Sequence, residues 1–194
     1  MKIILASQSP RRRELLERMG LMDFEICPAQ GEERAEPGLT PDRLVEELSA
    51  AKAREIALLQ PEALVIAADT VVAVDGRVLG KPRSRQEAEQ MLALLSGRSH
   101  RVYTGVTVRQ GEREQVDHEV TEVVFAPLTP EQIRAYVDTA EPMDKAGSYG
   151  IQGRGCVLVE GIRGDYYNVV GLPVCRLAGM LRQFGVEPLA GREE

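Results

Sequence analysis

The sequence predicts an α/β protein in which helices pack on a mixed, partly antiparallel sheet. Three observations support this fold class. Residues 63–68 (ALVIAA) form an apolar run bounded by polar residues, which is typical of a central strand covered on both faces. Helix-start signals recur between such runs along the whole chain. Turn dipeptides at 75–76 and 110–111 predict hairpins, and therefore antiparallel strands.

The first half of the chain alternates strands and helices. Residues 2–6 predict a short buried strand. Ser9 is the expected N-cap of a helix in which Pro10 takes the first position and which Gly20 ends. The same signals predict a helix from Thr40-Pro41 to residue 59, the strand at 63–68 and a hairpin over 71–79 that turns at Asp75-Gly76.

The second half begins with a helix whose start carries the capping-box pair Ser84 and Glu87. Thr129 and Gln132 repeat that spacing at the start of a later helix. The other expected elements are paired strands at 100–108 and 116–125, a strand at 156–162, and a last helix from Pro173 to Gly185. The length of residues 1–194 suits one domain or two small lobes, and no internal repeat or low-complexity linker divides the chain.

Composition excludes several functional classes. The net charge is −6 and no basic block is present, which argues against nucleic acid as a partner. Cys27, Cys156 and Cys175 are too scattered for a structural zinc site or a disulfide framework, so free thiols in a reducing compartment are expected. Apolar runs are too short for a leader peptide or a membrane span. We therefore expect a cytoplasmic protein without a membrane partner.

The segment from Ser7 to Arg13 predicts a strand end that turns into a helix. Exposed amides at such a turn can bind an anion. Arg11, Arg12 and Arg13 are unfavourable at the positive end of a helix dipole, and a bound phosphate would relieve the conflict. The alternative is a solvated basic first turn with nearby acids as partners.

Acidic and basic residues elsewhere allow a catalytic or metal site. Asp69-Thr70 follows the predicted central strand, where a carboxylate could hold a cation, take a proton from water or merely cap a turn. Lys52 lies on the apolar stripe of its helix, so it either extends past the core to solvent or reaches a polar cleft. Glu32-Glu33 could complete an all-oxygen magnesium or manganese site with Asp69, although paired loop acids are usually just solvated.

Two glycine-containing segments complete the candidate sites. Gly80-Lys81-Pro82 lacks the spacing and the hydroxyl residue of a phosphate-binding P-loop. Residues 144–153 contain three glycines, which allow a ligand to approach the backbone closely. Gln152 in this segment offers an amide that can pair with a base edge. The alternative is a flexible surface loop.

These segments occur together, and in this order, in one known family. They read LASQSPRRRELL, AADTVV, GKP, LSGRSHRVYTGV, EPMDKAGSYGIQG and GDYYNVVGLP. Over nearly its whole length the chain resembles the Maf family of nucleotide pyrophosphatases. The resemblance implies a fold like that of inosine-triphosphate pyrophosphatases, with an elongated mixed sheet flanked by helices and two lobes around a central cleft. It also implies a divalent metal cofactor, Mg²⁺ or Mn²⁺, and a possible homodimer.

The resemblance assigns roles to individual residues. It implies that Asp69 is the catalytic proton acceptor and that Glu32 or Glu33 lies beside the metal with it. The implied phosphate-binding residues are Ser7, Arg11, Arg12, Lys52 and Lys81. Whether Asp69 deprotonates water or only ligates the metal stays open at this stage. In either case the chemistry is positioning and charge stabilisation with no covalent intermediate.

Three positions indicate the substrate. Arg11, Thr70 and Gln152 match the subgroup of this family that acts on dTTP and UTP. The subgroup that acts on 7-methyl-GTP has Trp, Gln and Glu at the three corresponding positions, and the chain does not resemble it there. We therefore expect a nucleoside triphosphate pyrophosphatase that removes dTTP, UTP or modified pyrimidine triphosphates from the nucleotide pool. The alternative is a non-catalytic nucleotide-binding regulator of cell division or septum formation.

Overall fold

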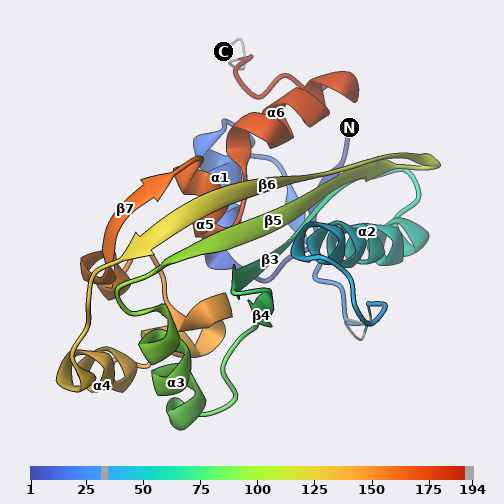
Figure 1. The fold of residues 1–194 in the computed structure, drawn as a ribbon. Helices are drawn as coiled ribbons and strands as arrows, with labels where there is room; N and C mark the ends of the chain where they lie inside the picture. The colour runs from blue at the N-terminus through green and yellow to red at the C-terminus, as the bar shows by residue number, and fades with distance from the viewer. Residues whose placement is uncertain (32–34, 191–194) are drawn as a thin grey trace. The chain divides into compact units, whose positions relative to one another are not determined.

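The computed structural model describes residues 1–31 and 35–190. The first elements are β1 (Ile3–Leu5), α1 (Pro10–Arg18), β2 (Glu25–Ile26), α2 (Pro41–Leu59), β3 (Leu64–Val74), β4 (Arg77–Leu79), α3 (Arg85–Leu95) and β5 (Ser99–Gln110) (Figure 1). They are followed by β6 (Arg113–Phe125), α4 (Pro130–Asp138), the 3₁₀ turns η1 (Glu141–Asp144), η2 (Ala146–Ser148) and η3 (Arg154–Leu158), β7 (Val159–Arg163), α5 (Tyr166–Val170) and α6 (Val174–Gln183). No helix in these described ranges is long and apolar enough to cross a membrane.

The described strands form one mixed sheet in the order β2-β1-β3-β5-β6-β7, with β4 paired to β3. β1 is parallel to both β2 and β3, whereas the β3–β4 and β6–β7 pairs are antiparallel. Leu5 lies opposite Ile66, so β1 ends while β3 continues to Val74. The predicted fold class, an α/β mixed sheet flanked by helices, is confirmed.

The chain divides into two compact units. Unit 1 contains Met1–Asp69, Thr104–Glu119 and Gly171–Glu194, and unit 2 contains Thr70–Tyr103 and Val120–Val170. Three strands, β3, β5 and β6, therefore contribute residues to both units. The central cleft expected from the resemblance stays a prediction.

Small side chains let α2 pack closely on the strands of unit 1. One core cluster joins α2 to β1, to β3 and to the residues that adjoin these strands. Its members are Ile4, Ala6, Ala53, Ile56, Ala57, Ala63, Val65 and Ala67. At β5 the approach is closer still, because a Cβ on Gly105 would lie 2.1 Å from the carbonyl oxygen of Val45. Any larger residue at position 105 would push α2 away from the sheet.

Aromatic rings occupy the core of unit 2. His100, Phe125 and Tyr149 contact one another edge to face, with ring centroids 4.7 to 5.3 Å apart. The His100 Nε2 atom and the Tyr149 hydroxyl are 2.8 Å apart. Burial lowers the pKa of His100 to about 4, so the ring is neutral at pH 7. Around the rings, α3 and α4 pack against each other (Figure 1).

Most predicted helix starts are confirmed. The Ser9 hydroxyl caps α1 by accepting the Arg12 amide, and Thr129 with Gln132 makes both bonds of its capping box. The capping box at Ser84 is only half formed. Ser84 accepts the Glu87 amide, but the Glu87 carboxylate accepts the amide of Arg83, which lies one residue before Ser84.

Two strand predictions were wrong in extent. The strand expected at 156–162 begins only at Val159, because residues 154–158 form the η3 turn. The Cys156 amide donates to the Gly153 carbonyl at 3.1 Å and the Val159 amide donates to the Cys156 carbonyl, so these amides are not available to a sheet ladder. The strand expected to end at residue 68 instead runs through Asp69 to Val74. The short elements β2 and α5 were not predicted, since neither has a recognisable pattern of its own.

Candidate active site

Asp69 lies within β3 and not at its end, so the sequence-based placement of this residue was wrong. It nevertheless lies at the end of a neighbouring strand, because β1 stops opposite Ile66. The last ladder contact there is the Ala6 amide, which donates to the Ile66 carbonyl at 2.8 Å. Asp69 is only 8% exposed. The expected position beside the carboxyl end of a parallel strand is thus supplied by β1.

Lys52 meets Asp69 inside unit 1. Its Nζ donates to Asp69 Oδ1 at 2.5 Å, and the two side chains are 19% and 11% exposed. Of the two interpretations of Lys52, the structure therefore favours a polar destination. A charge pair this shielded from water interacts more strongly than a surface pair, and removing one partner leaves the other charge poorly solvated.

The turn between β1 and α1 is organised by the Ser7 hydroxyl. Its Oγ accepts the Ser9 amide at 3.2 Å and Arg12 Nη1 at 3.1 Å. Arg12 Nε also donates to the carbonyl of Gly171 at 2.8 Å, so its guanidinium folds back over the turn. Arg13 instead pairs with Glu17 on the exposed helix surface. The Ser7 and Arg12 side chains are thus brought together at this turn, and their binding of an anion stays a prediction.

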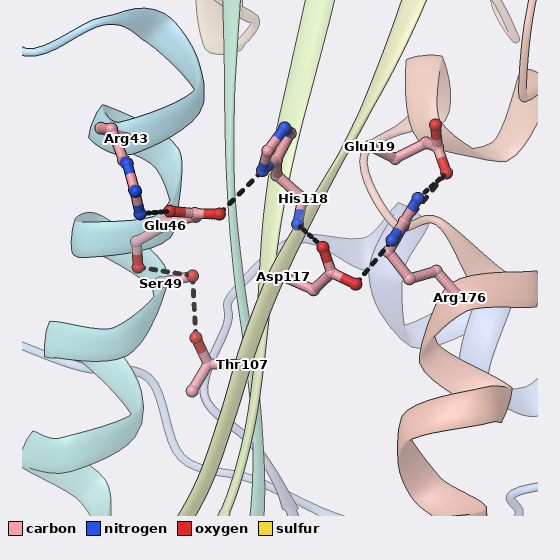
Figure 2. A network of polar contacts seen from close by, with 8 residues as sticks. All are labelled: Arg43, Glu46, Ser49, Thr107, Asp117, His118, Glu119 and Arg176. Atoms are coloured by element: carbon pink, nitrogen blue, oxygen red, sulfur yellow. Dashed lines mark hydrogen bonds and ion pairs between the residues drawn. The ribbon is translucent and has the colours of Figure 1, made fainter.

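A polar network fixes the position of α2 over the sheet (Figure 2). The Ser49 and Thr107 hydroxyls are 2.9 Å apart, and His118 Nδ1 lies 2.8 Å from Glu46 Oε1. Both contacts join α2 to strands of unit 1. Since Lys52 lies about one helical turn after Ser49, these contacts also set how far Lys52 Nζ reaches along β3.

The opposite side of β6 holds α6. Arg176 Nη1 donates to Asp117 at 2.5 Å, and its other guanidinium nitrogens donate to Glu119 at 2.9 and 3.1 Å (Figure 2). Asp117 and Glu119 therefore point towards α6, whereas His118 between them points towards α2. This is the alternation of side chains that a strand imposes.

Glu55 of α2 anchors the chain just before Glu32. Its two carboxylate oxygens accept the amides of Gln30 and Gly31 at 2.6 and 3.0 Å. Glu32 and Glu33 themselves lie outside the described residues. Within the ranges that are described, no group of three His, Cys, Asp or Glu side chains could hold a metal ion. The oxygen donor that the structure does describe for the predicted metal set is Asp69.

In unit 2, Lys81 and the glycine-containing segment meet through their backbones. The Gly147 amide donates to the Gly80 carbonyl at 3.1 Å, directly before Lys81. Gly147 has a φ of 68°, and a Cβ there would lie 2.7 Å from Val72 Cγ2. Lys81 is exposed, and Gln152 is exposed in a turn of the same unit. Thr70 follows Asp69 in β3 and is the first residue of unit 2.

The sequence model of the Maf-like protein family matches residues 2–184. The chain belongs to the Maf family. Relatives with curated names include the dTTP/UTP pyrophosphatase of Symbiobacterium thermophilum, which is 54% identical and aligns over 98% of this chain and 97% of that protein. The dTTP/UTP pyrophosphatase of Moorella thermoacetica is 56% identical over 96% of both chains.

The fold of this Maf protein is also found among solved structures. A HAM1 protein from Coxiella burnetii aligns with a TM-score of 0.53 over 94% of this chain and 99% of that one. The two sequences are 19% identical, so the comparison supports the shared fold and nothing more specific. The expectation of an α/β fold and the resemblance to Maf proteins are thereby both confirmed.

Several residues that organise this Maf protein were missed in the sequence. Glu55 looks like an ordinary exposed helix acid, and Glu141 looks like a loop acid before Pro142. Both carboxylates accept backbone amides from distant residues, and such partners leave no side-chain signal in the sequence. Gly105 gave a faint signal only, because an isolated glycine in a strand pattern suggests a close backbone approach.

Proposed function

We propose that this chain hydrolyses dTTP and UTP to the nucleoside monophosphate and pyrophosphate, and so removes unwanted pyrimidine triphosphates from the nucleotide pool. Support comes from relatives of this name that are more than 50% identical over nearly the whole chain. The structural observation that carries the proposal is the shielded Lys52–Asp69 pair beside the end of β1. It supplies a carboxylate held ready next to a fixed positive charge.

The charged side chains of unit 1 suit a phosphate substrate. Ser7, Arg11, Arg12 and Lys52 would bind phosphate oxygens, and Lys81 of unit 2 would neutralise further charge. Water attacks the α-phosphorus while the bond to the leaving pyrophosphate oxygen breaks. Asp69 accepts the proton from that water. In the alternative version Asp69 would only hold a divalent metal, and the proton would pass to solvent. In both versions the hydrogen bond from Lys52 Nζ holds the Asp69 carboxylate in place.

A divalent metal, Mg²⁺ or Mn²⁺, is part of the proposal. Asp69 would provide one hard oxygen ligand, and Glu32 or Glu33, which lie outside the described residues, would provide another. When bound, the ion would polarise the phosphate and make water easier to deprotonate. Arg11, Thr70 and Gln152 are proposed to select the pyrimidine substrate, with the exposed Gln152 amide contacting the base edge.

Location and assembly belong to the same proposal. Cys27, Cys156 and Cys175 are free thiols, which supports a reducing compartment such as the cytoplasm. Association into a homodimer stays a prediction.

The test is pyrophosphate release from a panel of nucleoside triphosphates with magnesium or manganese. The wild-type chain should prefer dTTP and UTP, and Asp69→Asn should lower turnover by about 10³-fold or more, because an amide can neither take a proton nor carry the charge. Asn at position 69 still accepts a hydrogen bond from Lys52, so the fold should persist by circular dichroism.

Asp75→Asn is the matched control. Asp75 lies in the turn after β3, has a φ of 50° that asparagine tolerates, and pairs only with Arg98 among the contacts described for its carboxylate. Its activity should equal that of the wild type. Near-normal turnover by Asp69→Asn would refute the assigned role of Asp69, and a wild-type protein inactive on every nucleotide would refute the function itself.

A further inference from the structure

The turn that carries Gln152 is held at both ends by one pair of side chains. Glu141 Oε2 accepts the Arg154 amide at 2.8 Å, and Glu141 Oε1 accepts the Gly155 amide at 3.1 Å. The Tyr136 hydroxyl donates to Glu141 Oε1 at 2.8 Å and accepts the Gly150 amide at 3.1 Å. Gln152 lies midway between the two fixed ends, and its side chain is exposed.

The pair is itself well supported. Tyr136 is buried in the core of unit 2, and burial is the main reason that its pKa is raised, so the hydroxyl keeps the proton that it donates. Burial alone would raise the pKa of Glu141. The hydrogen bonds from the Arg154 amide, the Tyr136 hydroxyl and the Gly155 amide outweigh burial and lower the pKa, so the carboxylate is ionised. Lys145 Nζ also donates to the Glu141 carbonyl at 2.7 Å.

Glycines allow the turn to close on these two side chains. A Cβ on Gly153 would lie 2.4 Å from Glu141 Oε2, and one on Gly155 would lie 2.6 Å from the Tyr136 hydroxyl. Either contact is far inside van der Waals distance, so a side chain at these positions would displace the carboxylate or the hydroxyl from the amides. The glycines of this segment are therefore explained by the Glu141–Tyr136 pair as well as by access for a ligand.

We propose that Glu141, supported by Tyr136, is a positioning residue for base selection, because it fixes the turn from Gly150 to Gly155 that presents Gln152. The proposal rests on the proposed function, in which Gln152 contacts the pyrimidine base. A short amide side chain selects a base only if its donor and acceptor are held at a defined place. Glu141 fixes the place of the turn that carries Gln152 and does so without touching the substrate.

Glu141→Gln tests the proposal with little change in size. The amide group replaces one acceptor oxygen by an NH₂ donor, so one of the two turn amides would face a donor. We expect the ratio of kcat/KM for UTP to that for GTP to fall about tenfold, with the loss carried mainly by UTP. Glu131→Gln is the matched control, since Glu131 is an exposed acid of α4 that pairs with Arg134, and its ratio should be unchanged.

A double-mutant cycle separates positioning from general loosening. In a Gln152→Ala background, Glu141→Gln should produce no further loss of selectivity, because the group that it positions is gone. Full addition of the two losses would overturn the proposal, and so would a folded Glu141→Gln variant with the wild-type ratio. If Gln152→Ala itself leaves the ratio unchanged, both the proposed contact of Gln152 with the base and the positioning role of Glu141 are refuted.

Two further readouts keep the outcomes distinct. If Glu141→Gln does not fold, Gly153→Ala replaces it and should lower the same ratio, because its Cβ displaces the same carboxylate. An unchanged ratio in a folded Gly153→Ala protein would then count against the proposal. A wild-type chain that releases no pyrophosphate would contradict the proposed function, whereas an active and selective wild type with an unaffected Glu141→Gln variant contradicts only the role of Glu141.

Discussion

The contact between Lys52 and Asp69 shows how one ion pair can serve both folding and activity. Both side chains are largely shielded from water, and the Nζ–Oδ1 distance is 2.5 Å. A shielded ion pair adds little to the free energy of unfolding compared with apolar residues of similar size. Removing one partner is nevertheless destabilising, because the other charge stays poorly solvated. The pair therefore constrains which substitutions the site tolerates.

Lys52→Met should lower the free energy of unfolding by about 2 kcal/mol and reduce activity strongly, because Asp69 loses its counter-charge. In the double variant Lys52→Met/Asp69→Asn the stability should largely return, while activity stays absent. Urea unfolding and pyrophosphate release measure the two effects. Lys2→Met, which breaks an exposed pair with Glu25, should change stability by less than about 0.5 kcal/mol. Equal destabilisation in the single and double variants would contradict this account.

Burial of His100 gives stability a dependence on pH. Its pKa is lowered to about 4 in the folded protein. Below the ordinary histidine pKa of 6.5, the unfolded chain therefore binds a proton that the folded chain does not bind. Stability therefore falls as the pH drops from 6.5 towards 4, by up to about 1.4 kcal/mol per pH unit. Urea unfolding between pH 5 and 7 measures the slope, and His100→Gln should flatten it. A wild-type slope in a folded His100→Gln protein would contradict this assignment.

Among the secondary-structure elements, α2 has the most tightly specified position. Gly105 lets its backbone approach β5, Ser49 bonds Thr107, and Glu46 bonds His118. Each contact joins residues more than 50 positions apart in the sequence. The helix itself could be predicted from Thr40-Pro41 and its apolar stripe, but its position on the sheet could not, because that depends on distant partners.

Gly105→Ala should displace α2. The new Cβ would meet the Val45 carbonyl, a backbone atom that cannot swing aside, so we expect a loss of about 2–3 kcal/mol in unfolding free energy. Activity should fall as well, because Lys52 moves with the helix. Gly179→Ala in α6 is the control, since no described atom lies within 4 Å of its Cβ position, and it should be neutral or stabilising by up to about 1 kcal/mol. Wild-type activity in Gly105→Ala would show that Lys52 tolerates the shift.

At the scale of the whole molecule, the sequence predicted the fold class, most helix starts and the family. These follow from local signals, such as Ser9-Pro10, and from motifs in a fixed order. The path of β3 through Asp69 could not be predicted, because β3 also pairs with β5, a strand distant in the sequence. The η3 turn could not be predicted either, because the Glu141 carboxylate binds its first two amides. Glu55 and Glu141 were missed for a related reason, because each binds backbone amides that lie 13 or more residues away in the sequence.

The division of the chain has a consequence for how the protein is made. Unit 1 is complete only when Gly171 and the α6 helix join segments that were synthesised much earlier. On the ribosome, Lys52 and Asp69 are therefore synthesised long before α6, which completes the same unit. No single cut in the gene yields either unit as a continuous fragment, so exchange of one half between relatives would require several crossovers at once.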